Sequence, residues 1–85
     1  MSFLQDTYFS EKENSPYSYR INFISGVGCY IENIKKVLGF SDTEVLLAVA
    51  RKTILIKGKG LIIKSYFSGD MQIVGEITSF EEVEN

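Results

Sequence analysis

The chain has 85 residues, of which 45% are hydrophobic and 24% are charged, and its formal net charge is −2. This length allows one domain with a small core, and the near-balanced charge is no indication of nucleic-acid binding. The chain contains no histidine and a single cysteine, Cys29, which excludes an intrachain disulfide and a typical zinc site.

Residues 1–18 are polar and show no sustained hydrophobic period, so they are predicted to form a flexible N-terminal arm. They lack the charged start and apolar run of a signal peptide, and no apolar run approaches the roughly 18 residues of a membrane span. We therefore expect an intracellular, soluble protein. A single all-β domain is expected over residues 19–80, followed by an acidic tail over 81–85.

From Arg20 onward, β-branched and aromatic residues dominate and turn signals recur about every 8–12 residues, which is typical of an all-β domain. The leucines and alanines of residues 43–51 also suit a helix, but Thr43, Val45 and Val49 favour a strand. We predict a small antiparallel meander, curled into a sandwich or a partly open barrel, with the N-terminal arm across one face. The expected strands are 19–25, 28–39, 44–50, 53–57, 60–67 and 71–79.

Alternation along these strands assigns their side chains to two faces. The first face is apolar throughout and is the predicted core: Val45, Leu47, Val49, Ile54, Ile56, Leu61, Ile63, Met71, Ile73 and Ile77. The second face is more apolar than a solvated surface, so the arm, a second sheet or another subunit is expected to cover it. It forms the candidate interaction face: Leu46, Leu55, Lys57, Lys59, Ile62, Lys64, Tyr66 and Val74.

The segment IKGKGLIIKS, residues 56–65, has the residue types of a phosphate-binding loop in the wrong order. Such a loop needs its glycines followed by lysine and a hydroxyl residue at the start of a helix, whereas LIIK has strand character. We therefore interpret Gly58 and Gly60 as the turn of a β-hairpin with lysines at its tip.

No arrangement of residues predicts catalysis, a cofactor or a metal ion. Cys29 has no histidine to activate it and is expected to be a small buried hydrophobic residue. The acidic residues fall in turns or in the tail and do not converge on a cleft. We therefore expect a protein that is not an enzyme.

Charge is unevenly distributed along the chain, with seven basic residues between Lys35 and Lys64 and five acidic residues, but no basic one, after Lys64. The two segments could pair as neighbouring strands of one sheet, or they could support head-to-tail association of copies or contact with an anionic surface. Tyr66 and Phe67 lie near lysines, as in proteins that stack single-stranded nucleic acid, but the pI of about 5.0 weakens that interpretation.

Several short motifs occur in a set order: YRINFISG (19–26), YIEN (30–33), FSDTEV (40–45), LIKGKGLIIK (55–64) and MQIVGEI (71–77). With this set the chain resembles the YabP/YqfC family of bacterial sporulation proteins, and more closely the YqfC branch. The resemblance implies an endospore-forming bacterium, expression in the mother cell, a role in forming the spore envelope and an integral-membrane sporulation protein as partner. It implies no catalytic residues.

The functional hypothesis is a non-enzymatic assembly or adaptor module that binds a protein partner through the candidate interaction face. It places the protein in the mother-cell cytoplasm, peripheral at the forespore membrane surface. A second copy of the chain and an anionic membrane surface are further candidate partners, whereas nucleic acid is not expected. The alternative is a small β-barrel that binds a ligand or single-stranded nucleic acid.

Overall fold

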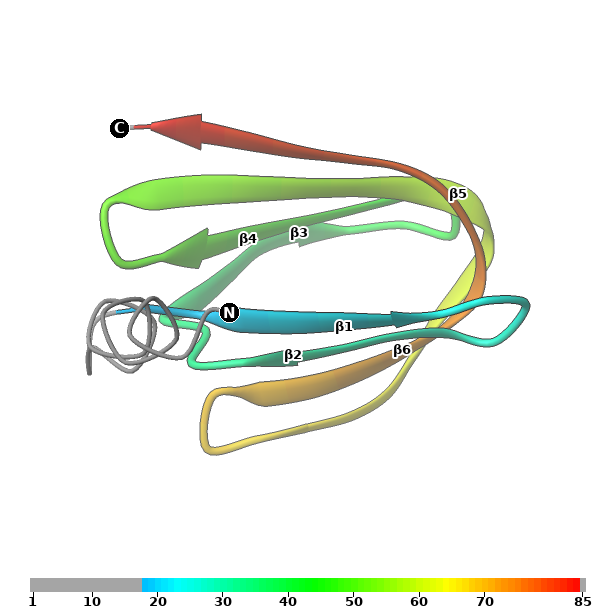
Figure 1. The fold of residues 1–85 in the computed structure, drawn as a ribbon, viewed down its shortest axis with the longest axis horizontal. Coiled ribbons are helices and arrows are strands. Elements are labelled where there is room, and N and C mark those ends of the chain that lie inside the picture. The colour runs from blue at the N-terminus through cyan, green and yellow to red at the C-terminus, as the bar shows by residue number, and fades with distance from the viewer. Residues whose placement is uncertain (1–17, 85) are drawn as a thin grey trace, which may run out of the picture.

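The computed structural model describes residues 18–84 and shows an all-β protein, as the sequence predicts (Figure 1). Every regular element among these residues is a β-strand. The strands are β1 (Arg20–Ile24), β2 (Gly28–Glu32), β3 (Lys36–Phe40), β4 (Glu44–Val49), β5 (Lys52–Phe67) and β6 (Asp70–Glu84). Residues 43–51, for which a helix was the competing prediction, contain β4.

The six strands form one continuous antiparallel sheet in the order β1-β2-β6-β5-β4-β3. Strands β3 to β6 follow one another as a meander, and the β1–β2 hairpin joins the sheet by pairing β2 with the first residues of β6. The predicted meander therefore holds for four strands. Within the described part of the chain the sheet stays open, with β1 and β3 as its outermost strands.

The β5–β6 hairpin bends near its middle (Figure 1). The pairing of β5 with β6 shifts register between Lys57 and Gly58 and again between Lys59 and Ile62. Such β-bulges bend a strand, and glycine at a bulge allows a conformation that other residues rarely adopt. Gly60 has a φ of 61° and Gly75, on the facing strand, a φ of 134°.

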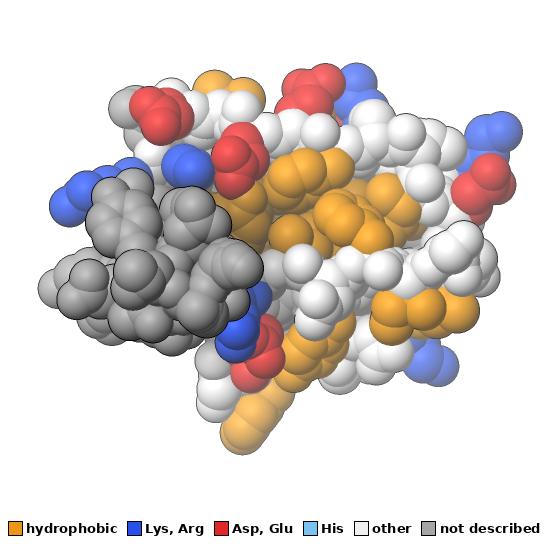
Figure 2. Space-filling model, in the orientation of Figure 1, with side chains coloured by type: hydrophobic (Ala, Val, Ile, Leu, Met, Phe, Trp, Pro, Cys, Tyr) orange, Lys and Arg blue, Asp and Glu red, His pale blue; other side chains and the backbone are white. Residues whose placement is uncertain are grey.

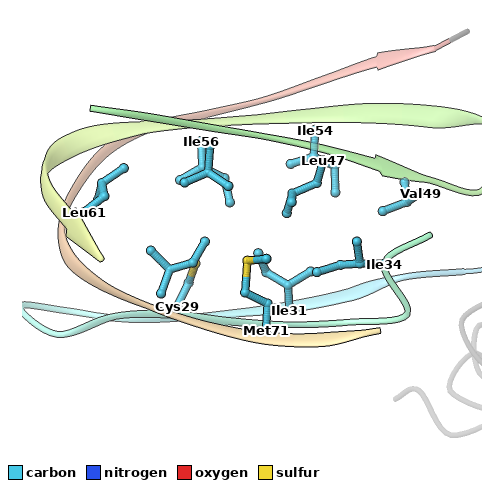
Figure 3. Close-up of a cluster of buried hydrophobic side chains, with 11 residues drawn as sticks. Cys29, Ile31, Ile34, Leu47, Val49, Ile54, Ile56, Leu61 and Met71 are labelled. Atoms are coloured by element: carbon cyan, nitrogen blue, oxygen red, sulfur yellow. The ribbon is translucent and has the colours of Figure 1, made fainter. Parts of the chain in front are cut away.

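The bend divides the sheet into two halves that lie on opposite sides of the core (Figures 1 and 3). The β1–β2 half consists of β1, β2, residues 61–67 of β5 and residues 70–74 of β6. The β3–β4 half consists of β3, β4, residues 52–57 of β5 and residues 79–84 of β6.

Eleven buried side chains from both halves form a single core: Cys29, Ile31, Ile34, Val45, Leu47, Val49, Ile54, Ile56, Leu61, Met71 and Ile73 (Figure 3). Eight of them belong to the predicted core face. The other two members of that face, Ile63 and Ile77, are half-buried and pack against the cluster. Alternation thus identified the core correctly, and the predicted burial of Cys29 is confirmed.

The predicted hairpin turn at KGKG is wrong, because β5 continues from Lys52 to Phe67 without a break. Its backbone remains paired with β6 on one side and is held on the other by the loop before β4. The Gly58 amide donates to the Thr43 carbonyl at 2.9 Å and the Leu61 amide donates to the Asp42 carbonyl at 2.8 Å. The glycines therefore bend a strand here and do not reverse it.

The predicted strand 28–39 is two strands, separated at Asn33, which adopts a φ of 72°. The Ile34 amide then donates to the Gly69 carbonyl at 2.7 Å, and the Lys35 amide donates to the Ala48 carbonyl at 2.8 Å. These bonds carry the chain from the β1–β2 half to the β3–β4 half. The connection depends on residues distant in sequence, which a local pattern does not contain.

The predicted acidic tail is strand as far as Glu84, since β6 pairs with residues 52–55 of β5 over this stretch. Glu81 lies opposite Leu55 and Glu82 opposite Ile54. Pairing with β6 satisfies the backbone groups of β5 here, and this stabilises the extension whatever the charge of the side chains. The predicted N-terminal arm, apart from Ser18, lies outside the described residues.

Candidate interaction surface

The ionisable groups of the described chain offer little for chemistry. Among residues 18–84, no group of three or more carboxylate, cysteine or histidine side chains is placed to hold a metal ion. Burial raises the pKa of Cys29 to about 11, so its thiol stays protonated at neutral pH and is a poor nucleophile. No helix among these residues is long and apolar enough to cross a membrane.

Tyr19, Glu82 and Lys52 form a polar contact between the start of β1 and the end of β6. The Tyr19 hydroxyl donates to the Glu82 carboxylate, and Lys52 Nζ lies 3.4 Å from Glu82 Oε1. The hydrogen bond from Tyr19 is the largest effect and lowers the pKa of Glu82; burial opposes it to a smaller extent, and Lys52 lowers the pKa further. Burial and the Glu82 carboxylate raise the pKa of Tyr19. The contact links the two halves of the sheet.

Phe23 and Phe80 make a second link between the halves. Their rings meet edge to face with centroids 5.4 Å apart, and Phe80 packs against the core. Apolar side chains are visible between β1 and the end of β6 in the space-filling view (Figure 2). An aromatic pair of this geometry contributes about 0.5–1.5 kcal/mol beyond its buried area. These contacts favour a structural role for the residues between β1 and the end of β6.

The candidate interaction face does not form one surface, because the bend places its members on the outer faces of both halves. Leu46 and Leu55 lie opposite each other on the β3–β4 half. Lys57 lies two positions along β5 from Leu55, on the same face, and opposite Glu44. Ile62 and Val74 lie opposite each other on the β1–β2 half. The two pairs therefore point away from each other, on either side of the core.

Lys59, Lys64 and Tyr66 depart from the simple alternation as well. Lys59 is exposed at the bend, opposite Glu76, and a register shift falls between Ile63 and Ser65, so that Lys64 is an extra residue. Tyr66 consequently lies opposite the buried Met71, on the core side of β5, and not beside Ile62. The aromatic and basic residues on which the nucleic-acid alternative depends are thus not aligned on one face.

The outer face of the β1–β2 half carries an apolar patch that spans its four strands. Ile24 of β1 lies opposite Gly28 of β2, Gly28 opposite Val74 of β6, and Val74 opposite Ile62 of β5. Tyr30 occupies the next outward position of β2. We call Ile24, Tyr30, Ile62 and Val74 the outer apolar patch; Ile24 is 53% exposed, Ile62 55% and Tyr30 36%.

Sequence reasoning found Ile62 and Val74 but missed Ile24 and Tyr30. It placed no strand pair between residues 28–31 and 71–74, whose paired positions lie forty or more residues apart, so nothing brought these residues to one face. The available signal was alternation along this strand, which puts Tyr30 on the opposite face from Cys29 and Ile31, both of which are buried. Glycine at position 28 allows β2 to approach β6 closely, since a Cβ there would lie 2.0 Å from the Ile73 carbonyl oxygen.

The chain matches the family model described as the YabP family over residues 19–85. This range covers all six strands. No curated protein and no solved structure matches the chain.

Proposed function

Because the chain belongs to the YabP family, we propose that it acts in bacterial sporulation as a non-enzymatic assembly or adaptor protein. Family membership supports a role related to sporulation. The observation that carries the adaptor role is the outer apolar patch, whose two isoleucines are each more than half exposed on a sheet face that no described element covers. Exposed apolar patches on small soluble domains commonly mark surfaces for protein partners.

The proposed mechanism is burial of the outer apolar patch against a protein partner. Complete burial of an isoleucine contributes roughly 1.5–3 kcal/mol, so covering the exposed half of Ile24 or of Ile62 would contribute about 1 kcal/mol each. Tyr30 adds an aromatic side chain with a hydroxyl group, a residue type enriched among the strongest contributors to interfaces. The residue types and exposure of the patch therefore suit the centre of an interface.

The proposed partner is the integral-membrane sporulation protein that the family resemblance implies, with the chain in the mother cell at the forespore membrane surface. Lys59 and Lys64 are exposed on β5 on either side of Ile62, so an anionic lipid surface would attract the same region. Such attraction is screened by salt, whereas the apolar contact is not. The two contributions can thus be measured separately.

The test replaces patch residues and measures binding to the integral-membrane sporulation protein that the family resemblance implies, purified in detergent. We expect Ile24→Asp with Ile62→Asp to weaken binding at least tenfold. Phe67→Asp is the matched control, because Phe67 is 80% exposed but lies at the β5–β6 turn, five positions along β5 from Ile62. It should bind as the unmodified chain does.

The proposal also requires that the patch variant remain folded. Circular dichroism and the urea midpoint should change little, because both isoleucines face away from the core. A folded double variant that binds as tightly as the unmodified chain would overturn the proposal. A variant that unfolds would show instead that the patch is part of the core, and the milder Ile62→Ser and Val74→Thr changes would then be measured for binding.

A further inference from the structure

The β3–β4 half of the sheet has two free edges that run in opposite directions. Its strands follow the order β3-β4-β5-β6, and within the described residues the backbones of β3 and of residues 76–84 of β6 each pair on one side only. Beside this part of β6, Tyr19 and Phe23 make side-chain contacts alone. Since each strand is antiparallel to the next, β3 and this part of β6 are antiparallel to each other. A second copy shifted sideways along the sheet would therefore present its β3 to this β6 in antiparallel orientation, the geometry that every other pair in the sheet uses.

The two edges carry opposite charges. Lys35 and Lys36 lie exposed at the start of β3, and Glu81 and Glu84 lie exposed at the end of β6. None of the four forms an ion pair with another described residue. Charged edge strands normally prevent sheets from pairing, since like edges repel. Here that repulsion acts between two β3 edges or two β6 edges, whereas β3 and β6 attract each other.

The cross-strand register aligns these opposite charges at corresponding positions along the two edge strands. One row of directly opposed residues crosses the half from Lys36 through Ala48 and Thr53 to Val83, and another runs from Phe40 through Val45 and Ile56 to Phe80. If both rows continue into a second copy, its Lys36 lies opposite Val83 and diagonal to Glu81. Its Lys35 then lies opposite Glu84. Because the register of β3 shifts by one residue between Val37 and Gly39, its Phe40 lies opposite Phe80. Opposite charges and aromatic pairs in such positions stabilise sheets by roughly 0.2–1 kcal/mol each.

We propose that copies of this chain associate head to tail, with β3 of one copy pairing with residues 80–84 of β6 of the next and so extending the sheet. The contact is heterologous and leaves a free β3 edge at one end and a free β6 edge at the other, so it produces open chains, or rings where the rotation closes, and no two-fold symmetric dimer. A contact of five residues per strand buries less than the roughly 1,200 Å² of a stable interface, so association is weak and depends on concentration. It uses a different half of the sheet from the outer apolar patch and goes beyond the adaptor role.

A disulfide ladder tests the proposal directly. Lys36→Cys combined with Val83→Cys places one thiol on each edge, at positions that the pairing would bring to the distance a disulfide spans. Mild oxidation of this variant should give a ladder of covalent multimers on a non-reducing gel. Native Cys29 is buried and should not contribute.

Each variant with only one of the two introduced cysteines should give no product larger than a dimer. The matched control pairs Lys36→Cys with Val74→Cys, whose second thiol lies on the outer face of the other half. A ladder of equal yield from this control, or a folded Lys36→Cys/Val83→Cys protein that stays monomeric, would overturn the proposal.

Charge reversal provides a second test. Lys35→Glu with Lys36→Glu makes both edges acidic, and Glu81→Lys with Glu84→Lys makes both edges basic. Each variant alone should sediment as a monomer at protein concentrations where the unmodified chain associates, whereas an equimolar mixture should associate again. Raising the salt concentration should dissociate the mixture. If both variants sediment like the unmodified chain, or if mixing restores nothing, edge pairing between copies is refuted.

Discussion

Alanine at Gly58 and alanine at Gly60 should have very different effects, although the two glycines are two positions apart in β5. A Cβ at Gly58 would lie 2.1 Å from the Glu76 carbonyl oxygen and 2.9 Å from Leu61 Cδ2, whereas ordinary contact begins at 3.4 Å. Because the clashing oxygen belongs to the backbone of β6, no side-chain rotation relieves it. A Cβ at Gly60 would meet nothing within 4 Å, and only its φ of 61° opposes a side chain.

These geometries give different magnitudes. Overpacking of this kind costs typically about 1–3 kcal/mol and occasionally more, and the backbone clash at Gly58 places Gly58→Ala at or above about 3 kcal/mol. Left-handed backbone costs roughly 1–2 kcal/mol for an ordinary residue. Alanine recovers about 0.4–1 kcal/mol of this through the lower entropy of the unfolded chain, so Gly60→Ala should cost about 1 kcal/mol.

Urea unfolding followed by circular dichroism measures both losses, and for a domain of this size each 1 kcal/mol shifts the Tm by roughly 4–8 °C. Gly60→Asn serves as a control, since asparagine adopts left-handed backbone more readily than alanine and should cost less than Gly60→Ala. Equally small losses for Gly58→Ala and Gly60→Ala would refute the close approach of β5 to β6. The segment would then be the open hairpin turn that its composition suggests.

Three further outcomes follow from burial and charge. Ile54→Ala should lose about 2–5 kcal/mol of unfolding free energy, because Ile54 is fully buried, whereas Ile62→Ala should lose less than about 1 kcal/mol; a similar loss for both would contradict the assigned faces. Burial raises the pKa of Cys29 from 9.0 to about 11, so the folded state holds the thiol proton more tightly than the unfolded state does. The free energy of unfolding should therefore fall as the pH rises from 9 to 11. Cys29→Ala should reduce this dependence when urea midpoints are compared across pH. Tyr19→Phe should raise the pKa of Glu82 in an NMR titration. A carboxyl group whose pKa is lowered by folding stabilises the fold at pH values above its unfolded pKa, and this stabilisation is lost as the pH falls. The variant lacks part of this stabilisation, so it should lose less stability on acidification than the unmodified chain.

The amino-acid sequence by itself determined the fold class, the family and most of the core. Strict alternation in residues 44–49 and 53–57 identified Val45, Leu47, Val49, Ile54 and Ile56 as core residues, and all five are buried. Alternation succeeds there because those strands are regular and the side-chain period of a strand is two residues. The ordered motifs identified the family independently of any structural element.

Only the tertiary structure decided which residues share an outer surface. The bend at Gly58 and Gly60 separates Leu55 from Ile62, and the register shift before Ser65 turns Tyr66 to the core side. A shift of one residue moves every later side chain to the other face of a sheet, so local alternation cannot be carried across it. The bend and the pairing of β2 with β6 depend on hydrogen bonds between segments far apart in sequence. The outer apolar patch therefore exists only in the folded chain.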